Sequence, residues 1–333
     1  MSSAISPNKR LHQPRPAHII SNISPETSKR LFQTYFDCIH PMWPLLYKPL
    51  YTSLDYTYPS PGISAPLVLA IFAIASCVDN AQSSAQGGIK ERGSCPEPQV
   101  FFEEALDILQ RGTNSNSGRQ YMNAFVPSVT NCQVLVILAL QQHGVAEYAR
   151  AAMFGGLAAA MAIELRIHRV YKANDAVERE IHSRLWWNLY ILGNMMSCEM
   201  GRPILLRFEE SDCSWPSVSE SDEFELMSSQ LQVPAGQARN SSIKMRTMSA
   251  LHTTIRLAFI IERICREVYG IAARKTIRED QNAGERLRMQ LWRELQNWEK
   301  EVEASPLRLD LSDDLTSVPP SITNNVVRAY SYA

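Results

Sequence analysis

The segment E-R-E-I-H-S-R-L-W-W, residues 178–187, is the most informative stretch of this sequence. Glu180 and Arg184 are four positions apart with the acid first, which is the favourable order for an ion pair on one helix face. Trp186 and Trp187 are adjacent and point about 100° apart around a helix axis, so both are buried only if other elements cover several sides of the helix. The residues alone therefore predict a well-packed core helix with a surface salt bridge worth under about 1 kcal/mol.

Capping signals predict the ends of this helix and of several others. Asp175 and Glu178 resemble a capping box at its start, and Gly201 with Pro203 predicts its end shortly after Met196. No alternating pattern of apolar and polar residues exceeds four positions, so the sequence predicts an all-α fold. Caps and apolar residues at three- and four-residue spacing predict further helices over about residues 25–39, 67–78, 96–112, 129–144, 146–167, 242–269, 276–304 and 320–333.

The distribution of these helices predicts one large domain. Residues 1–23 are rich in Ser, Pro and Asn and are expected to form a flexible tail. Residues 24–333 are expected to form a single multi-helix domain. Within it, residues 204–240 lack helical periodicity and carry a Ser/Glu-rich run at 217–225, which predicts a long surface loop.

The charge and the hydropathy pattern exclude two classes of protein. The 333 residues include 33 Lys plus Arg and 34 Asp plus Glu, for a net charge of -1. Nucleic-acid binding by the whole surface needs clustered basic residues, so this balance argues against it. The most apolar run, residues 65–78, is shorter than the roughly 20 residues of a membrane-spanning helix, and no signal peptide precedes it. We therefore expect an intracellular protein without a membrane segment.

Motifs for catalysis and metal binding are missing from the sequence. The seven cysteines form no C-x2-C pair, and the histidines lack metal-ligand spacing. None of G-x-S-x-G, G-x4-G-K-[ST], G-x-G-x-x-G or H-E-x-x-H occurs. The nearest match to the magnesium-binding D-D-x-x-D of helical terpene cyclases, Asp313-Asp314, lacks the last acid. We therefore expect no enzymatic activity, no cofactor and no metal in this chain.

The order of several short motifs resembles the fungal-specific transcription factor domain, which lies downstream of Zn2Cys6 binuclear zinc clusters in fungal regulators. The resemblance is close over about residues 30–216, the expected core of the domain, and loose elsewhere. The matching pieces include an H-P-x-x-P segment, an L-Q-A-L-L-like helix, an element ending in histidine, R-x-W-W and G-R-P. The residues of these pieces that we expect to be structural or regulatory are His40, Pro41, Gln133, His168, Arg184, Trp186, Trp187, Gly201, Arg202, Pro203 and Pro216.

This resemblance implies the regulatory domain of a nuclear transcription regulator. Zinc and DNA binding are implied only for a Zn2Cys6 module, which the sequence lacks, so DNA would be bound through a missing or separate module. Implied partners are other proteins, a second copy of the chain or a small-molecule inducer. Residues 326–333 look like the start of a helix that continues in the family, so the domain is expected to be truncated at its C-terminal end.

The residues that carry the resemblance also have expected structural roles. Arg184 and Arg202 are candidates for ion pairs or hydrogen bonds that tie helices together. Trp186, Trp187 and Trp215 are expected to be core anchors or the walls of an apolar pocket. His168 falls near the end of a helix, where capping or packing is a simpler interpretation than metal ligation.

Two other functions stay open from the sequence. The first is an interaction protein, such as a repressor that binds other regulators, with its contact on the amphipathic helix of residues 287–302. The second is a helical enzyme or small-molecule carrier of secondary metabolism, which would need an apolar cavity with convergent carboxylates.

Overall fold

The computed structural model describes residues 23–51, 63–85, 96–111, 125–170, 175–226, 244–305 and 307. Helices make up most of these residues, which confirms the all-α class. A single antiparallel ribbon of two three-residue strands, β1 (Phe224–Leu226) and β2 (Lys244–Arg246), is the only sheet in the described ranges. The helices are α1 (Pro25–Thr34), α2 (Ala65–Ala85), α3 (Pro98–Arg111), α4 (Val129–Gly144), α5 (Tyr148–Glu164), α6 (Ala176–Met200), α7 (Thr247–Arg263), α8 (Ile271–Glu279) and α9 (Gln281–Ala304).

The capping residues of the sequence set several of these bounds. The side chains of Ser24, Ser128 and Asp175 each accept a hydrogen bond from a backbone N–H two or three residues later, at the starts of α1, α4 and α6. Gly201 ends α6 with a φ of 61°, a left-handed conformation that favours glycine. Local chemistry therefore fixes these helix ends, as the sequence predicts.

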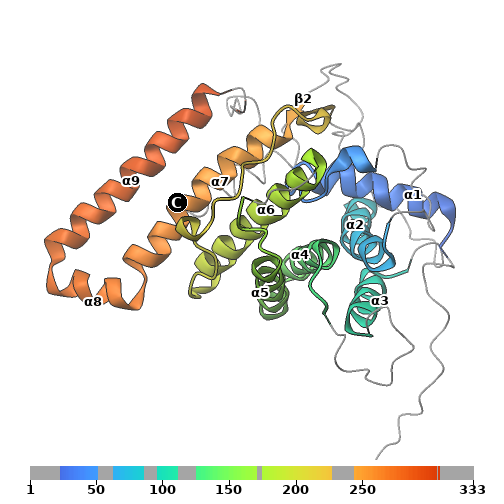
Figure 1. Cartoon of the computed structure of the whole chain (residues 1–333), viewed down its shortest axis with the longest axis horizontal. Helices are drawn as coiled ribbons and strands as arrows, with labels where there is room; N and C mark the ends of the chain where they lie inside the picture. The colour runs from blue at the N-terminus through green and yellow to red at the C-terminus, as the bar shows by residue number, and fades with distance from the viewer. Residues whose placement is uncertain are drawn as a thin grey trace, which may run out of the picture.

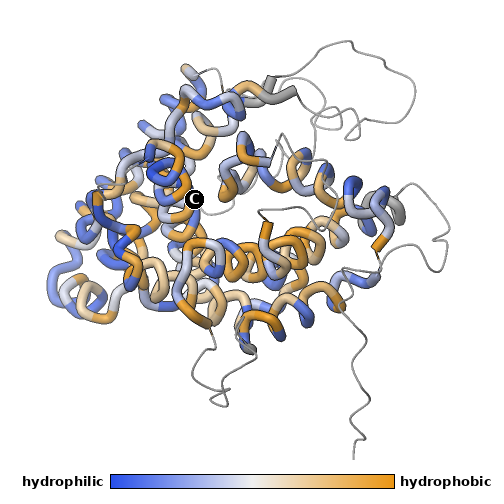
Figure 2. The backbone as a smooth tube through the Cα atoms, turned by 45° about the vertical axis from the view of Figure 1, so that its right-hand side comes forward, coloured by the Kyte–Doolittle hydropathy of each residue, from blue (hydrophilic) through white to orange (hydrophobic). Residues whose placement is uncertain are grey.

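The first six helices enclose most of the main hydrophobic core. The apolar helices α2 and α4 pack against each other, α5 packs on α4, and α6 packs on both α4 and α5. The helices α2 and α4 carry apolar side chains on every face, so each must be covered by other elements on every side. Figure 2 shows the contrast between this hydrophobic centre and the more hydrophilic side of the molecule formed by α8 and α9.

The helix α6 lies between the helices α4 and α5 on one side and the helix α7 on the other (Figure 1). It packs on all three. Leu251, Ile255 and Ala258 of α7 are buried in the same core as the residues of α6. The α6 helix therefore joins the first five helices to α7.

The C-terminal helices differ from the sequence prediction. The helix expected over 242–269 begins at Thr247, and its last turn, Ile264–Val268, is a π-helix. The helix expected over 276–304 is two helices, because Asp280 leaves the helical conformation and caps α9 by accepting from the N–H of Ala283 at 3.0 Å. The prediction of one helix there was wrong.

The α8 and α9 helices approach each other closely at Gly284. This glycine is buried, and a Cβ atom there would lie 2.6 Å from Cγ2 of Ile277 in α8. Such a distance is shorter than real Cβ contacts, so the absence of a side chain at Gly284 permits the tight hairpin of α8 and α9.

The amphipathic stripe on α9 packs against α7. Leu291 is buried, Trp298 is half-buried, and the Trp298 indole N–H donates a hydrogen bond to the Thr253 carbonyl at 3.0 Å. Exposed ion pairs flank this contact, among them Arg256 with Glu301. The face of residues 287–302 that the sequence offers to a partner protein is therefore partly covered by α7.

Some expectations lie outside the described residues. These are the tail of residues 1–22, the stretch 227–240 of the expected loop, the helix of residues 320–333 and the pair Asp313-Asp314. In the part of the chain that the structure describes, no helix is long and apolar enough to cross a membrane.

Candidate functional site

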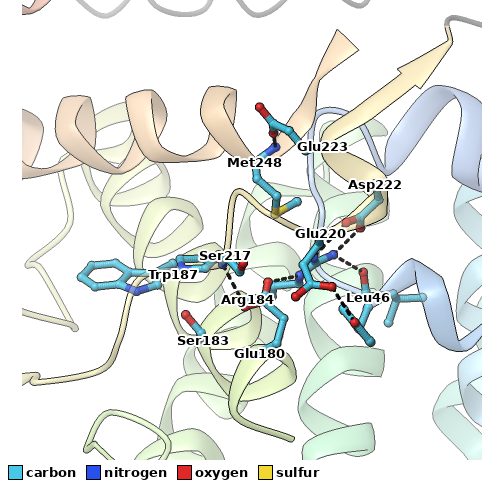
Figure 3. A network of polar contacts seen from close by, with 12 residues as sticks. Leu46, Glu180, Ser183, Arg184, Trp187, Ser217, Glu220, Asp222, Glu223 and Met248 are labelled. Atoms are coloured by element: carbon cyan, nitrogen blue, oxygen red, sulfur yellow. Dashed lines mark hydrogen bonds and ion pairs between the residues drawn. The ribbon is translucent and has the colours of Figure 1, made fainter. Parts of the chain in front are cut away.

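Arg184 of α6 is the centre of a buried ion-pair network (Figure 3). Its side chain has no exposed surface, and its Nε donates a hydrogen bond to Oε1 of Glu180 at 2.7 Å. Its two terminal nitrogens donate to the two carboxylate oxygens of Asp222 at 2.5 and 3.0 Å. One of them also donates to the carbonyl of Leu46 at 3.2 Å, and the guanidinium carbon lies 5.0 Å from the centroid of the Tyr47 ring. Each of the three guanidinium nitrogens therefore donates at least one hydrogen bond.

The network joins three segments that are far apart in the sequence. Nε2 of His40, which follows the π-helical turn after α1, lies 3.3 Å from Oδ2 of Asp222. The second carboxylate oxygen of Glu180 accepts from the backbone N–H of Ser217 at 2.9 Å. The Tyr47 hydroxyl donates to Glu220 at 2.6 Å. The segment before residue 48, the α6 helix and the residues 217–222 are thus bonded together around Arg184.

Opposite charge keeps both members of the central pair ionised. Burial alone would raise the pKa of the Asp222 carboxyl, but hydrogen bonds from His40 and Arg184 and the Arg184 charge hold it well below its usual value. Burial would lower the pKa of Arg184, and the Asp222 and Glu180 carboxylates raise it instead. The hydrogen bond to Glu220 and partial burial raise the pKa of Tyr47 to about 12.

The same turn that carries Asp222 also caps α7. Glu223 is buried and accepts hydrogen bonds from the N–H groups of Met248 at 2.7 Å and Ser249 at 2.9 Å, and from the Ser249 hydroxyl. These N–H groups belong to the first turn of α7, where a carboxylate satisfies free donors and favours the helix dipole. The residues 221–223 therefore connect Arg184 of α6 to the start of α7.

The tryptophans of α6 are packed on both sides. Trp187 donates from its indole N–H to the Ser214 carbonyl at 2.8 Å, and its ring lies 5.5 Å from that of Trp215 and 5.9 Å from that of Phe259. Trp186 is buried and lies 5.7 Å from the ring of His168. Trp215 is partly exposed, with 36% of its surface accessible.

The remaining sequence candidates lie in different environments. Pro41 and Gln133 are buried, the latter on α4, and the carbonyl of the buried Pro216 accepts a hydrogen bond from His252 at 2.7 Å. Arg202 and Pro203 are exposed, and Arg202 forms no ion pair with any described residue. Of the two arginines expected to tie helices together, only Arg184 does so among the described residues.

Two acidic residues of this site could not be recognised in the sequence. Asp222 and Glu223 fall in the expected surface loop, but their side chains are only 2% and 1% exposed. The salt bridge between Glu180 and Arg184, expected on the surface, is instead buried. These predictions were wrong because a Ser/Glu-rich run without periodicity gives no local sign that two of its acids pair with distant donors.

The described residues contain no group of three or more His, Cys, Asp or Glu side chains that could hold a metal ion. The arrangement around Arg184 instead binds protein segments to one another. We call this buried ion-pair network of Arg184, Glu180, Asp222 and His40 the Arg184 joint, because its charged hydrogen bonds hold separate segments together.

Comparison with known proteins gives the family of the chain. Residues 32–300 match the model of the fungal specific transcription factor domain. The uncharacterized transcriptional regulatory protein C3C7.04 of Schizosaccharomyces pombe is 24% identical over 192 residues, which cover 57% of this chain and 22% of that protein. The uncharacterized transcriptional regulatory protein C1683.13c of the same yeast is 24% identical over 176 residues, or 49% of this chain and 26% of that protein.

The match thus spans about a quarter of the length of these curated relatives. No solved structure matches the chain. The family model, however, covers most of its residues. The chain therefore belongs to the family of fungal transcription regulators that share the fungal-specific transcription factor domain.

Proposed function

We propose that this chain is the regulatory domain of a fungal transcription regulator, that it acts in the nucleus and that it catalyses no reaction. The family match over residues 32–300 and the two relatives named as transcriptional regulatory proteins support this proposal. The continuous core from α1 to α7 supports the part of the assignment of residues 24–333 to a single helical domain that these helices cover.

The observation that carries the proposal furthest is the joint around Arg184. Asp222 holds Arg184, and its neighbour Glu223 holds the first turn of α7. A displacement of α7 relative to α6 would pull on this turn and expose charged groups that are now paired. The joint therefore couples the position of α7 to the packing of the first six helices. Such a coupling lets a partner protein, a second copy or a small-molecule inducer change the state of the whole domain.

In this proposal the sequence candidates have structural or regulatory roles. His40 and Arg184 belong to the joint itself. Trp186 and Trp187 anchor α6 in the core, and Gly201 ends that helix. The others in the set are Pro41, Gln133, His168, Arg202, Pro203 and Pro216, of which Arg202 and Pro203 are exposed.

A reporter assay tests the regulatory role. The whole chain is fused to an unrelated DNA-binding domain and directed to a promoter in yeast, and transcription is compared with that of the DNA-binding domain alone. We expect the fusion to raise or lower transcription and Arg184→Met to change this effect at equal protein level. Arg256→Met, in an exposed ion pair, is the matched control and should behave like the unchanged fusion. A fusion with the same output as the DNA-binding domain alone would contradict the proposal.

We expect no sequence-specific DNA binding by residues 1–333 alone. The net charge is -1, and several arginines that could contact phosphate are paired with acids, among them Arg263 with Glu294 and Arg266 with Glu209. Phosphate binding needs unpaired clustered cations, so DNA recognition is assigned to a separate Zn2Cys6 module with its own zinc. A mobility-shift assay at low salt checks this expectation, and nanomolar, sequence-dependent binding would contradict it.

A further inference from the structure

The outer face of the helix α8 is basic. Positions 271, 274, 275 and 278 share one face of a helix, because residues three and four apart are neighbours on its surface. All four positions are exposed, and they hold Ile271, Arg274, Lys275 and Arg278. The side chains of the three cations form no ion pair or hydrogen bond with any residue that the structure describes. We call these four residues, together with Tyr269 just before the helix, the α8 face.

The α8 face is open to solvent in the part of the chain that the structure describes. Ile271 is 91% exposed, and Tyr269 is 68% exposed. The helix packs through another side, where Ile277 lies against Gly284 of α9. The hairpin of α8 and α9 lies at the edge of the molecule, away from α1 to α3 (Figure 1). The α8 face thus offers positive charge and two exposed apolar side chains to a partner.

The composition of the α8 face favours a protein segment over nucleic acid. A tight DNA complex contacts about six to ten phosphates, which is more than three cations on one short helix can neutralise. Exposed apolar side chains such as Tyr269 and Ile271 are stabilised when apolar residues of a partner cover them, and a phosphate backbone has none. The face is therefore complementary to an acidic peptide segment that also carries apolar residues.

The chain itself contains such a segment. Residues 309–315 read L-D-L-S-D-D-L, with three leucines, three aspartates and no cation. The three aspartates fall within five consecutive residues, as do the three cations of α8. The segment lies outside the described residues, so only its sequence is compared with the face. The two stretches are complementary in charge and similar in apolar content.

The acidic segment cannot occupy the α8 face of its own molecule. Gly284 adjoins α8 and Ser305 follows α9, and about 30 Å of helix separates these two residues. Asp310 lies within about 18 Å of Ser305 even along a fully extended chain. Asp310 therefore cannot reach Arg278 of the same chain. An occupant that uses the whole acidic segment must come from another molecule.

We propose that the α8 face binds residues 309–315 of a second copy of this chain. Two copies that exchange the segment form two identical contacts, which close a symmetric dimer. A single contact is weak because exposed ion pairs contribute little, and the second contact gains from the high effective concentration within the dimer. The inference deepens the proposed function by naming a partner and its surface, and it rests on that function only for the regulatory use of the dimer.

The mass of the full chain in solution tests the proposal. Sedimentation equilibrium gives the dissociation constant of the dimer at about 50 mM and at about 500 mM salt. We expect a dimer at low salt and a dissociation constant at least about tenfold larger at high salt, because salt screens exposed charges. A chain that is monomeric at low salt, or a dimer that salt leaves unchanged, would overturn the proposal. The measurement is independent of the reporter assay, so either proposal can fail alone.

Reversed charges show whether the two stretches meet. We expect Arg274→Glu with Arg278→Glu, and likewise Asp310→Lys with Asp314→Lys, to weaken self-association about a hundredfold. A mixture of the two reversed proteins should form a heterodimer about as tight as the original dimer, because both of its contacts regain opposite charges. Arg293→Glu changes an exposed cation of α9 outside the α8 face, and this matched control should dimerise like the unchanged chain. Circular dichroism establishes that each variant is folded.

Three outcomes of these experiments would contradict the contact. The first is a reversed protein that dimerises alone as tightly as the unchanged chain, and the second is a pair of folded reversed proteins that stay monomeric when mixed. The third is a monomeric chain that retards DNA in a gel and loses this property in Arg274→Glu with Arg278→Glu. That last result would assign the α8 face to nucleic acid instead of a second copy.

Discussion

Arg184→Met will lower the free energy of unfolding by about 3–5 kcal/mol, because it leaves two buried carboxylates without their cation. Methionine fills much of the space of the arginine stem but donates no hydrogen bond. Asp222 would lose two hydrogen bonds from the guanidinium group, and Glu180 would lose one. Urea unfolding of the full chain, followed by circular dichroism, measures the change.

An exposed arginine provides the control for this prediction. Arg256 pairs with Glu301 at 2.8 Å, but more than half of each side chain is exposed. Water and salt screen this pair, so Arg256→Met should cost less than about 1 kcal/mol. Equal losses in the two variants would mean that burial of the Arg184 network contributes nothing to stability.

The pH dependence of the Arg184→Met effect follows from the lowered pKa of Asp222. In the unfolded chain this carboxyl has a pKa of about 3.9, and in the folded chain its pKa is lower. The stabilisation is therefore complete above the unfolded value and is lost as the pH falls toward the folded value. In Arg184→Met, protonation of Asp222 relieves the unpaired charge. The difference in stability between the two proteins should therefore shrink mainly as the pH falls below about 4, toward the lowered pKa of Asp222 in the folded chain.

Trp187→Ala will lower the free energy of unfolding by about 3–5 kcal/mol through the loss of a large buried aromatic side chain. Trp187 is 1% exposed and contacts the rings of Tyr190, Trp215 and Phe259. The variant also removes the hydrogen bond to the Ser214 carbonyl. The cavity would lie where α6, α7 and the segment before Pro216 meet. Urea unfolding again provides the measurement.

A second tryptophan tests whether burial is the cause. Trp292 lies on the outer face of α9 with 51% of its surface exposed. Its replacement by alanine should change the free energy of unfolding by no more than about 0.5 kcal/mol. If Trp292→Ala were as destabilising as Trp187→Ala, the assignment of Trp187 as a core anchor would be wrong.

The sequence predicted the helices well where local chemistry decides their ends. Ser24, Ser128 and Asp175 satisfy backbone N–H groups in their own first turns, and Gly201 adopts a conformation that other residues avoid. These interactions span only a few residues, so they can be recognised without knowledge of the fold. The break at Asp280 had such a local signal, a capping aspartate, that the stronger apolar periodicity of residues 287–302 obscured.

The candidate site could be predicted only in part, because its acids come from distant segments. Glu180 lies one helical turn before Arg184, so spacing alone pairs them. Asp222 follows Arg184 by 38 residues in a stretch without periodicity, and nothing nearby shows that it is buried. The π-helical turn after α7 is equally hidden, since it depends on the neighbours against which it packs.

The contact between His40 and Asp222 has a consequence for the order in which the chain folds. The two residues are 182 positions apart, whereas the contacts between α2 and α3 and between α4 and α5 join segments close in sequence. Closing a long loop costs more chain entropy than closing a short one, so we expect the local helical hairpins to form first. Arg184 would then remain hydrated until the segment of residues 217–223 arrives. Desolvation of the arginine would be one of the last steps of folding, and premature termination of synthesis before residue 222 would leave its charge without its principal partner.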